Sequence, residues 1–289
     1  MLIKPHISAI LLCMIILGPP LTGGATILPR MRISVENNHK HVQTKAVNRF
    51  AKDISQKLAG QIDVRFFSNA SLFRDRDIIQ SLAQGKVEMA VPGTWHVMQF
   101  EPNAGIFMLP TFYGREASVN YAILDSPIGE RINRGIEKKL QVKILGRWLD
   151  LGHAHLFGVH RDINRHEDIK GLRVRVAGGT ANKIRIQALG AVPRIIPWPD
   201  LPEHMQQNRV DAVLTSYETI RSAALWEKGV QSAFEDREYF PQYIPLIRMS
   251  FWQKLSPQIQ QVLRNAWEQH VNEARQQAAE AQAQAKKIL

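Results

Sequence analysis

Residues 61–93 read QIDVRFFSNASLFRDRDIIQSLAQGKVEMAVPG and contain a strand, a loop, a helix and a second strand in succession. In QIDVRFF, the apolar residues Ile62, Val64 and Phe66 alternate with polar ones, which predicts a half-buried strand. The segment RDIIQSLAQ has a helical pattern and is closed by Gly85, and VEMAV follows as another apolar strand. This order predicts parallel strands that lie side by side with a helix across one face of the sheet.

The residues before this stretch extend the same pattern. Met31, Ile33 and Val35 alternate in RMRISVE, and apolar residues then recur at helical spacing from Val42 to Leu58. The resulting β-α-β-α-β order predicts a parallel sheet. Such a sheet places ligand-binding loops at the carboxyl ends of its strands.

A second series of strands and helices begins near His155. Its strand-like segments are HLFGVH, GLRVRVAG, VPRIIPW and VDAVLTS, with helical segments between them. Two series of similar size predict an α/β fold of two lobes with a ligand cleft between them. We expect lobe I over residues 26–150 and lobe II over residues 151–245. Residues 246–289 are expected to add a strand and a long helix that spans the lobes or packs on them.

Two longer helices are predicted outside these series. One extends from about Ser118 to Leu140. The other is the last element of the chain, with Ser256 as its N-cap and Pro257 at its first position. After Ala274 this helix becomes rich in Ala and Gln, so we expect its outer half to bury little.

The first 25 residues have the layout of a secretory signal peptide. Lys4 precedes an apolar run from Ile7 to Leu17, which is followed by Gly and Pro and by small residues up to Ala25. The run is shorter than the roughly 20 apolar residues that cross a membrane. Cleavage near Ala25 removes the only cysteine, Cys13, and leaves 36 Lys and Arg against 26 Asp and Glu, a net charge of +10.

Charge, cysteine content and motifs limit the possible functions. The whole chain has 37 Lys and Arg against 26 Asp and Glu, which favours nucleic acid, anionic lipid or a small anion as partner. Export argues against nucleic acid. A single cysteine excludes a disulfide scaffold and a cysteine-rich metal centre. The sequence contains no nucleophile elbow, phosphate-binding loop, dinucleotide-binding turn or zinc-protease motif, so we expect no enzyme activity and no cofactor.

The sequence contains two His-x-His pairs that are candidate metal ligands, His39/His41 and His153/His155. Residues two apart on a strand share a face, so His153 and His155 can reach one ion. Zinc normally takes three or four protein ligands, however, and no clear set is present. We therefore predict no metal site, and expect His153 and His155 to bond backbone or ligand groups.

Basic residues gather in residues 161–194, where eight stand against three acidic residues. In GLRVRV, alternation places the apolar residues on one face of a strand and Arg173 and Arg175 on the other. An arginine offers a planar fork that matches a carboxylate with two hydrogen bonds. The ordinary alternative for any one arginine is a solvated charge or an ion pair.

Residues 168–176, DIKGLRVRV, resemble a segment of the solute-binding proteins of TRAP transporters, of the C4-dicarboxylate-binding (DctP) type. Further segments resemble that family in the same order along the chain: KDISQKLAGQIDVRFFSNASLFRDRDIIQSLAQGKVEMAV, IFMLPTFY, ALGAVPRIIPW, NRVDAVLTSYETIRSAALWEKGV and FWQKLSPQIQQVLRNAW. The resemblance covers about residues 30–275. It implies a two-lobed periplasmic binding protein that closes on a ligand, commonly an organic acid.

The resemblance also implies a ligand site. The family's central arginine, which binds the ligand carboxylate, matches Arg175. The aromatic position after Leu-Gly-Ala matches Trp198, and the polar position after Val-Asp falls near Thr215. The early loop and the turn after the third strand contribute Asn38 and Trp95.

Four further residues are predicted near the ligand: Arg147, His153, His155 and Tyr217. Many family members carry a second ligand arginine where this chain has the histidines of GHAHLFGVH. The stretch DAVLTSYE likewise replaces the family's Asp-Gly-x-Glu-Asn. One carboxylate held by Arg175 is therefore predicted, whereas a plain dicarboxylate is not.

The tryptophans are predicted to have different roles. Trp198 lies between two prolines and Trp95 follows a Pro-Gly turn, so both are placed in the cleft. Trp226 and Trp252 are expected to pack against the fold, and Trp267 belongs to the stripe of the last helix and is expected in the core.

These observations predict a monomeric periplasmic binding protein that delivers a small organic acid anion to TRAP membrane subunits. Two alternatives stay open. One is a binding module for a sensor kinase or chemoreceptor, and the other is a periplasmic metal-binding protein or enzyme that uses the histidines. Family members usually continue some tens of residues past the long helix, whereas this chain ends at Leu289, which fits a short member or a truncated product.

Overall fold

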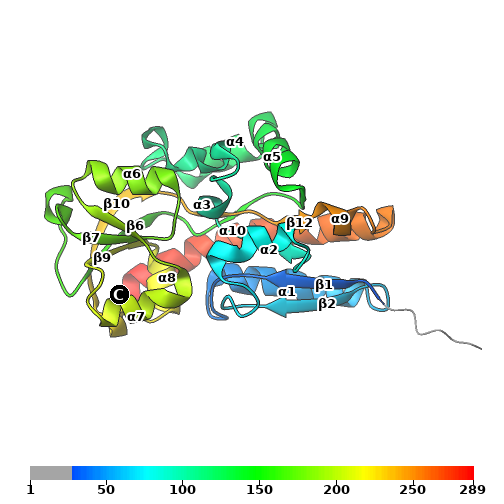
Figure 1. Cartoon of the computed structure of the whole chain (residues 1–289), viewed down its shortest axis with the longest axis horizontal. Helices are drawn as coiled ribbons and strands as arrows, with labels where there is room; N and C mark the ends of the chain where they lie inside the picture. Colours follow the sequence, from blue (N-terminus) through cyan, green and yellow to red (C-terminus); the bar gives the residue numbers. More distant parts are fainter. Residues whose placement is uncertain (1–27) are drawn as a thin grey trace, which may run out of the picture.

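The computed structural model describes residues 28–289, which form two α/β lobes that lie side by side (Figure 1). The predicted signal peptide, residues 1–25, lies outside the described residues. In the described part of the chain, no helix is both long enough and apolar enough to span a membrane.

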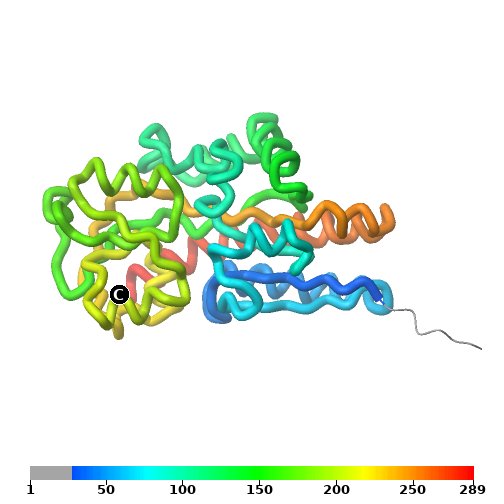
Figure 2. The backbone as a smooth tube through the Cα atoms, viewed as in Figure 1, coloured from blue at the N-terminus to red at the C-terminus, as the bar shows by residue number. Residues whose placement is uncertain are grey.

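The first lobe is built on a five-stranded sheet in the order β2-β1-β3-β12-β4. Its strands are β1 (Arg30–Ser34), β2 (Asp63–Phe67), β3 (Met89–Ala90), β4 (Val142–Ile144) and β12 (Leu246–Arg248). As predicted from alternation, Met31 and Ile33 of β1 are fully buried. Strand β1 pairs in parallel with β2 and β3, whereas β12 returns from the C-terminal part of the chain and pairs antiparallel with β3 and β4 (Figure 2).

The second lobe contains a sheet in the order β10-β6-β9-β7-β8. Its strands are β6 (Ala154–Val159), β7 (Arg173–Val176), β8 (Val192–Ile195), β9 (Ala212–Thr215) and β10 (Val230–Tyr239). Strand β7 pairs in parallel with β8 and β9, and β6 pairs antiparallel with β9 and β10. Strand β10, VQSAFEDREY, was not predicted, because the polar residues Ser232, Asp236 and Glu238 lie on its less exposed face and interrupt the apolar alternation.

Helices pack around the two sheets. They are α1 (Val42–Lys57), α2 (Ile78–Ala83), α3 (Thr94–Val97), α4 (Ala117–Leu124), α5 (Pro127–Leu140), α6 (Thr180–Ala188), α7 (Leu201–Gln206), α8 (Tyr217–Ser222), α9 (Met249–Trp252) and α10 (Pro257–Ile288). The single helix predicted near residues 118–140 is two helices. The chain breaks at Asp125 and Ser126, where the Ser126 side chain caps α5 by accepting a hydrogen bond from the N–H of Ile128.

Two extended segments that run between the lobes pair with each other. Strands β5 (Leu149–Asp150) and β11 (Gln242–Tyr243) form a small antiparallel ribbon. The side chain of Asp150 is held in the ribbon by the hydroxyl of Tyr121 at 2.7 Å and by the N–H of Gly152 at 2.8 Å. A narrow ribbon between two larger lobes is the arrangement of a hinge. The lobe boundaries at residues 150 and 245 remain predictions.

Helix α10 crosses behind both lobes (Figure 1). It begins as predicted, with the Ser256 side chain accepting a hydrogen bond from the N–H of Ile259. Its Ala- and Gln-rich half is mostly exposed, as expected, but Ala278 and Ala285 are buried, at 1% and 0% exposure. Small alanines let α8 of the second lobe approach closely, and Gln282 bonds to backbone groups of that lobe at 2.6 and 2.7 Å.

The tryptophans follow the predictions with one exception. Trp252 and Trp267 are buried, and the Trp267 ring meets Phe50 of α1 edge-on at 5.2 Å between ring centroids. Trp226 is 42% exposed, so the packing role predicted for it is wrong. It lies in the short 3-10 helix Leu225–Lys228, whose buried residue is Leu225.

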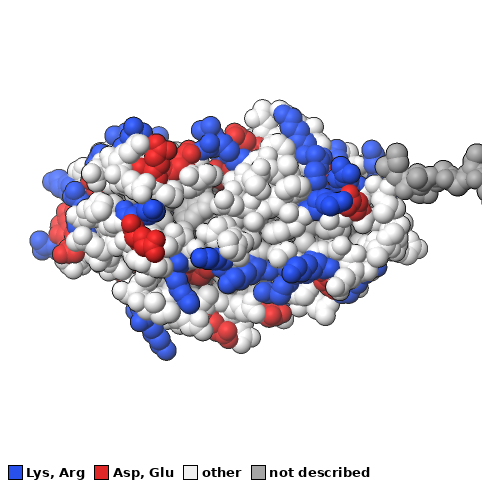
Figure 3. All heavy atoms as spheres, turned by 90° about the horizontal axis from the view of Figure 1, so that it is seen from below, with Lys and Arg blue, Asp and Glu red and all other residues white. Residues whose placement is uncertain are grey.

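The basic side chains are spread over the surface. On the face shown in Figure 3, Lys and Arg lie over both lobes, and Asp and Glu are scattered among them. The basic residues are therefore dispersed over this face and do not form one continuous stripe that would bind a polymeric anion.

Candidate functional site

A buried cavity of about 40 Å³ lies between the two lobes. The first lobe lines it with Glu36, Asn37, Asp75 and Trp95; the second with Arg175, Ala177, Trp198, Leu214, Thr215, Ser216 and Thr219; and the connecting segments with Leu151, Ala154, Tyr239, Pro241 and Tyr243. Many of these residues follow the carboxyl ends of parallel strands, where open α/β sheets bind ligands. A space of this size holds only a few water molecules, so the lobes are closed around it.

Among residues 28–289, Arg175 is the only Lys or Arg in the cavity wall. Alternation along β7 buries Val174 and Val176 in the core of the lobe and turns Arg175 toward the cleft, where it is 2% exposed. Its Nε donates a hydrogen bond to the carbonyl of Ile196 at 3.1 Å, and its Cζ lies 5.8 Å from the centre of the Trp198 ring. Burial lowers the pKa of Arg175, and the nearby Asp75 and Glu36 carboxylates oppose that shift. An arginine remains charged under these conditions.

Arg173 does not line the cavity, although the sequence places it on the same face of the strand as Arg175. Its guanidinium forms a bidentate pair with Asp211, with Nε–Oδ2 and Nη2–Oδ1 distances of 2.8 and 2.9 Å. This pairing lowers the pKa of Asp211 to about 2. Arg173 is thereby an ion-paired residue at the other end of the strand.

Trp95 closes the first-lobe side of the cavity. Trp95 lies in α3, which follows β3. Its ring packs edge-on against Tyr243 at 5.2 Å and Tyr239 at 6.3 Å between ring centroids. Gly93 makes this position possible, because a Cβ there would lie 2.2 Å from an atom of the Trp95 ring. Among the described residues, the indole Nε1 of Trp95 has no hydrogen-bond partner.

Two buried carboxylates face the arginine. Asp75 accepts hydrogen bonds from the backbone N–H of Trp198 at 2.8 Å and from that of Arg76 at 3.0 Å. Glu36 accepts a hydrogen bond from the hydroxyl of Tyr243 at 3.3 Å through Oε1. Its Oε2 lies 3.4 Å from Nε2 of His96.

A surface groove of about 400 Å³ continues from this wall, and Asp75, Trp95 and Ala177 line both the groove and the cavity. His96 also lines the groove. The Asp75 carboxylate therefore stands between the closed cavity and the surface groove.

Of the predicted site residues, the structure brings four together in the cavity wall: Arg175, Trp198, Thr215 and Trp95. Asn38 is outside the wall. Its Oδ1 accepts a hydrogen bond from the N–H of Lys40 at 2.9 Å, and its Nδ2 donates to the carbonyl of Ser222 at 3.1 Å.

The remaining four predicted residues are also outside the wall, because their side chains have other partners. Arg147 forms an ion pair with Glu268 of α10 at 2.6 Å. Tyr217 donates a hydrogen bond to Glu235 at 2.8 Å. His153 packs on Phe240, and His155 packs on Tyr217, at ring-centroid distances of 5.2 and 5.5 Å. Direct ligand contact by any of the nine residues remains a prediction.

Sequence reasoning missed the polar residues that oppose Arg175. Glu36 fell only within a loop matched by resemblance, and Asp75, His96, Tyr239 and Tyr243 were not singled out. They come from separate loops and one short helix, so no common spacing joins them in the sequence. A polar loop after an apolar strand was the only available signal.

Two α/β lobes closed on a buried arginine and aromatic side chains define a class, the two-lobed solute-binding proteins. Comparison with known families then gives the particular family. The chain belongs to the DctP family, "Bacterial extracellular solute-binding protein, family 7", whose family model matches residues 33–289. The chain is thus a solute-binding protein of the TRAP type.

Relatives and solved structures agree with this assignment. A solute-binding protein of Chromohalobacter salexigens is 24% identical over 85% of this chain and 72% of its own length. The 2,3-diketo-L-gulonate-binding periplasmic protein YiaO of Escherichia coli is 21% identical over 87% of this chain and 76% of its own. The galactonate complex of the sugar acid binding protein DctPAm from Advenella mimigardefordensis superposes with a TM-score of 0.84, at 22% identity, over 91% of this chain and 84% of that one. A succinate-bound TRAP protein from Sulfurospirillum deleyianum gives a TM-score of 0.82 at 21% identity, over 89% and 83%. These two structures establish the shared fold.

Proposed function

We propose that this protein binds an organic acid in the periplasm and delivers it to the membrane subunits of a TRAP transporter. The observation that carries the proposal is the position of Arg175, a buried guanidinium in the wall of a cavity between two lobes. A buried charge is costly unless it is paired. A ligand carboxylate is the natural partner, because it matches the arginine fork with two charge-assisted hydrogen bonds.

The orientation of the guanidinium supports this role. Its Nε is engaged by the carbonyl of Ile196, and its plane lies near the Trp198 ring. Within residues 28–289, no further hydrogen bond of this guanidinium is formed. The terminal nitrogens are thereby held ready for a ligand, and the fixed side chain loses little further entropy on binding.

The rest of the wall suits the carbon skeleton of a small acid. The rings of Trp95 and Trp198 supply apolar faces, and the Trp95 Nε1 supplies an additional donor. Polar residues at the end of β9 and the start of α8 form the second-lobe side, where Thr215 and Ser216 stand. Such a mixture of aromatic walls with a few polar groups is typical of small-molecule sites.

The proposed ligand class is supported by proteins with the same fold. Those relatives and structures are named for binding succinate, galactonate, galacturonate and 2,3-diketo-L-gulonate. Each of these ligands carries a carboxylate. We infer that the present chain also binds a carboxylate. Glu36, Asp75 and the aromatic residues would determine which other functional groups the ligand can carry.

Capture and release follow from the two-lobed architecture. The cavity is too small and too buried to fill without movement, so the lobes must separate about the β5–β11 ribbon to admit the ligand. Closure then buries the acid against Arg175. No covalent chemistry is part of this proposal. The signal peptide predicted for residues 1–25 would bring the chain to the periplasm.

The proposal is tested by identifying what the protein carries. Protein purified from its native host is denatured, and the released small molecules are analysed by mass spectrometry. Calorimetric titration with succinate, galactonate and galacturonate then ranks affinities. An organic acid released in a one-to-one ratio supports the proposal. A released ligand without an acidic group, combined with no heat from any of the three acids, contradicts it.

A further inference from the structure

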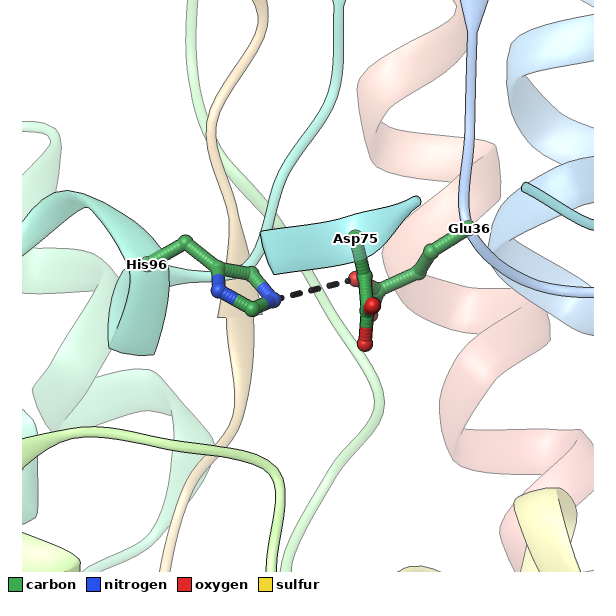
Figure 4. A group of neighbouring side chains, drawn as sticks. All are labelled: Glu36, Asp75 and His96. Atoms are coloured by element: carbon green, nitrogen blue, oxygen red, sulfur yellow. Dashed lines mark ion pairs between the residues drawn. The ribbon is translucent and has the colours of Figure 1, made fainter. Parts of the chain in front are cut away.

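We propose that Glu36, Asp75 and His96 form a binding site for one divalent transition-metal ion in the wall between the ligand cavity and the surface groove. Each residue offers one ligand atom, and the three atoms lie within 4.8 Å of one another. Glu36 follows β1, Asp75 begins the 3-10 helix Asp75–Asp77, and His96 lies on α3. Figure 4 shows the three side chains converging from these separate elements.

The histidine points to a ligand independently of the two carboxylates. His96 is 7% exposed and Glu36 8% exposed, so both are more than nine-tenths buried. The His96 Nε2 and the Glu36 Oε2 form an ion pair at 3.4 Å, and neither atom has a hydrogen-bond partner among the described residues. The imidazole edge is directed at the carboxylate oxygens (Figure 4). The ion pair alone leaves both atoms without a hydrogen bond in the protein interior, and a metal ion would coordinate both.

The spacing of the His96 and Glu36 ligand atoms fits a tetrahedral ion. Nε2 of His96 and Oε2 of Glu36 are 3.4 Å apart. Zinc binds imidazole nitrogen and carboxylate oxygen at roughly 2.0–2.1 Å, which separates two ligand atoms at the tetrahedral angle by about 3.3–3.4 Å. One imidazole and two carboxylates form a donor set for zinc or a neighbouring divalent transition metal.

Charge balance gives a separate reason for a cation. Among the cavity-lining residues, Glu36 and Asp75 each contribute −1, and Arg175 contributes +1. The charges of these three side chains sum to −1, which opposes the entry of an anion. A divalent ion changes the sum to +1, so that a monocarboxylate brings the closed site to neutrality.

The surroundings of the cluster provide orientation and access. The Tyr243 hydroxyl holds Oε1 of Glu36, and the Trp198 N–H holds Oδ2 of Asp75. Partners of this kind fix the direction of metal-binding carboxylates. Asp75 and His96 also line the surface groove of about 400 Å³, which gives an ion a path to the site.

The inference deepens the proposed function, and rests on it only for the role of the ion. Three protein ligands leave the fourth tetrahedral position open, as in sites where a metal ion also binds a small ligand. The open position would face the carboxylate that Arg175 holds. The ion would then supply the second positive charge for the organic acid.

A second cluster in the same chain provides a matched control. His166, Asp236 and Glu238 also place three ligand atoms within 4.8 Å. There the guanidinium of Arg185 already occupies the acidic groups, at 2.5 Å from Asp236 and 2.6 Å from Glu238. Because a cation is already in place, we expect no metal binding at this cluster.

The test uses the full protein after treatment with a chelator, and Zn²⁺ alone as the probe. Calorimetry should show one Zn²⁺ per chain. His96→Gln should lower the zinc affinity about tenfold or more, whereas His166→Gln should leave it unchanged. Thermal melts confirm that each variant is folded. Should His96→Gln fail to fold, Glu36→Gln replaces it, and Co²⁺ added to the unmodified protein should give the visible absorption of a tetrahedral ion.

The outcomes separate this inference from the proposed function. No zinc uptake, or uptake that only His166→Gln removes, overturns the metal site. If succinate or galactonate then still binds through Arg175, the proposed function stands without the ion. If zinc binds through His96, but the ligand released from the native protein has no acidic group and none of the three acids binds, the metal site stands and the ligand class is wrong.

Discussion

The Oδ2 atom of Asp75 accepts a hydrogen bond from the backbone N–H of Trp198 at 2.8 Å. Asp75 belongs to the first lobe and Trp198 to the second, so this bond crosses the cleft beside the ligand cavity. Their near neighbours Arg74 and Asp200 form an ion pair across the same gap. Together the two contacts stabilise the closed arrangement of the lobes.

Removal of the Asp75 carboxylate should destabilise the closed form. A hydrogen bond to a charged group contributes about 1.5–3 kcal/mol. Asp75→Ala is therefore expected to shift the ligand-free protein toward an open form, with a larger radius of gyration in small-angle X-ray scattering. The affinity for the organic acid should fall about tenfold or more, because closure then costs additional free energy.

Asp77→Ala is the matched control for this prediction, since Asp77 is two residues away and its side chain is half exposed. It should scatter like the unmodified protein. Equal radii of gyration for all three proteins would show that the Asp75–Trp198 bond does not hold the lobes.

The attachment of α10 to the first lobe gives a stability prediction. Arg275, on α10, is 7% exposed and binds Asp125 with two hydrogen bonds of 2.6 and 3.1 Å. It also donates to the carbonyl of Trp148 at 3.0 Å. Breaking a buried pair by removing one partner costs about 3–5 kcal/mol. Arg275→Ala should therefore lower the free energy of unfolding by about that amount in urea denaturation.

Arg131→Ala serves as the comparison, because Arg131 is an exposed arginine on α5. Its effect should stay within about 0.5 kcal/mol. If the two substitutions destabilise the protein equally, the pairing of Arg275 does not anchor the helix.

Buried histidine gives a pH dependence with a definite sign. Burial lowers the pKa of His155 from 6.5 to about 4. Below pH 6.5 His155 is protonated in the unfolded chain but stays neutral in the folded chain. The free energy of unfolding therefore falls as the pH drops from about 6.5 to about 4. A pKa difference of this size corresponds to roughly 3 kcal/mol.

His155→Gln should therefore reduce the loss of stability between pH 7.5 and pH 4.5, measured by urea denaturation at both values. His39→Gln, at an exposed histidine, should keep the full loss. An unchanged pH dependence in His155→Gln would mean that this imidazole is not held neutral by the fold.

Much of the framework could be predicted from the sequence because it depends on local patterns. The alternation in RMRISVE and GLRVRVAG gave two central strands, and it turned Arg175 away from the core. The Pro-Gly turn before Trp95 indicated that its ring lies in the cleft. These features need only a few consecutive residues, and the resemblance to the DctP family supplied their order.

The rest depends on contacts between distant segments. The sequence does not distinguish Arg147 from Arg175. In the structure Arg147 is paired with Glu268, which is 121 residues further along the chain, whereas Arg175 lies in the cleft. The Ala- and Gln-rich half of α10 shows no apolar stripe, and the burial of two of its alanines depends on how closely the second lobe approaches. Glu36, Asp75 and His96 meet only because three separate segments converge at one edge of the sheet.

The central claim is that Arg175 holds the ligand carboxylate, and calorimetry with Arg175→Ala tests it most directly. The acid identified by mass spectrometry is titrated into the unmodified protein, into Arg175→Ala, and into Arg173→Ala, whose arginine lies two residues away on the same strand. The account predicts roughly a 100-fold or greater loss of affinity for Arg175→Ala, in line with the removal of a buried charged partner, and near-normal affinity for folded Arg173→Ala. An Arg175→Ala protein that is folded and binds the acid as tightly as the unmodified protein would contradict it.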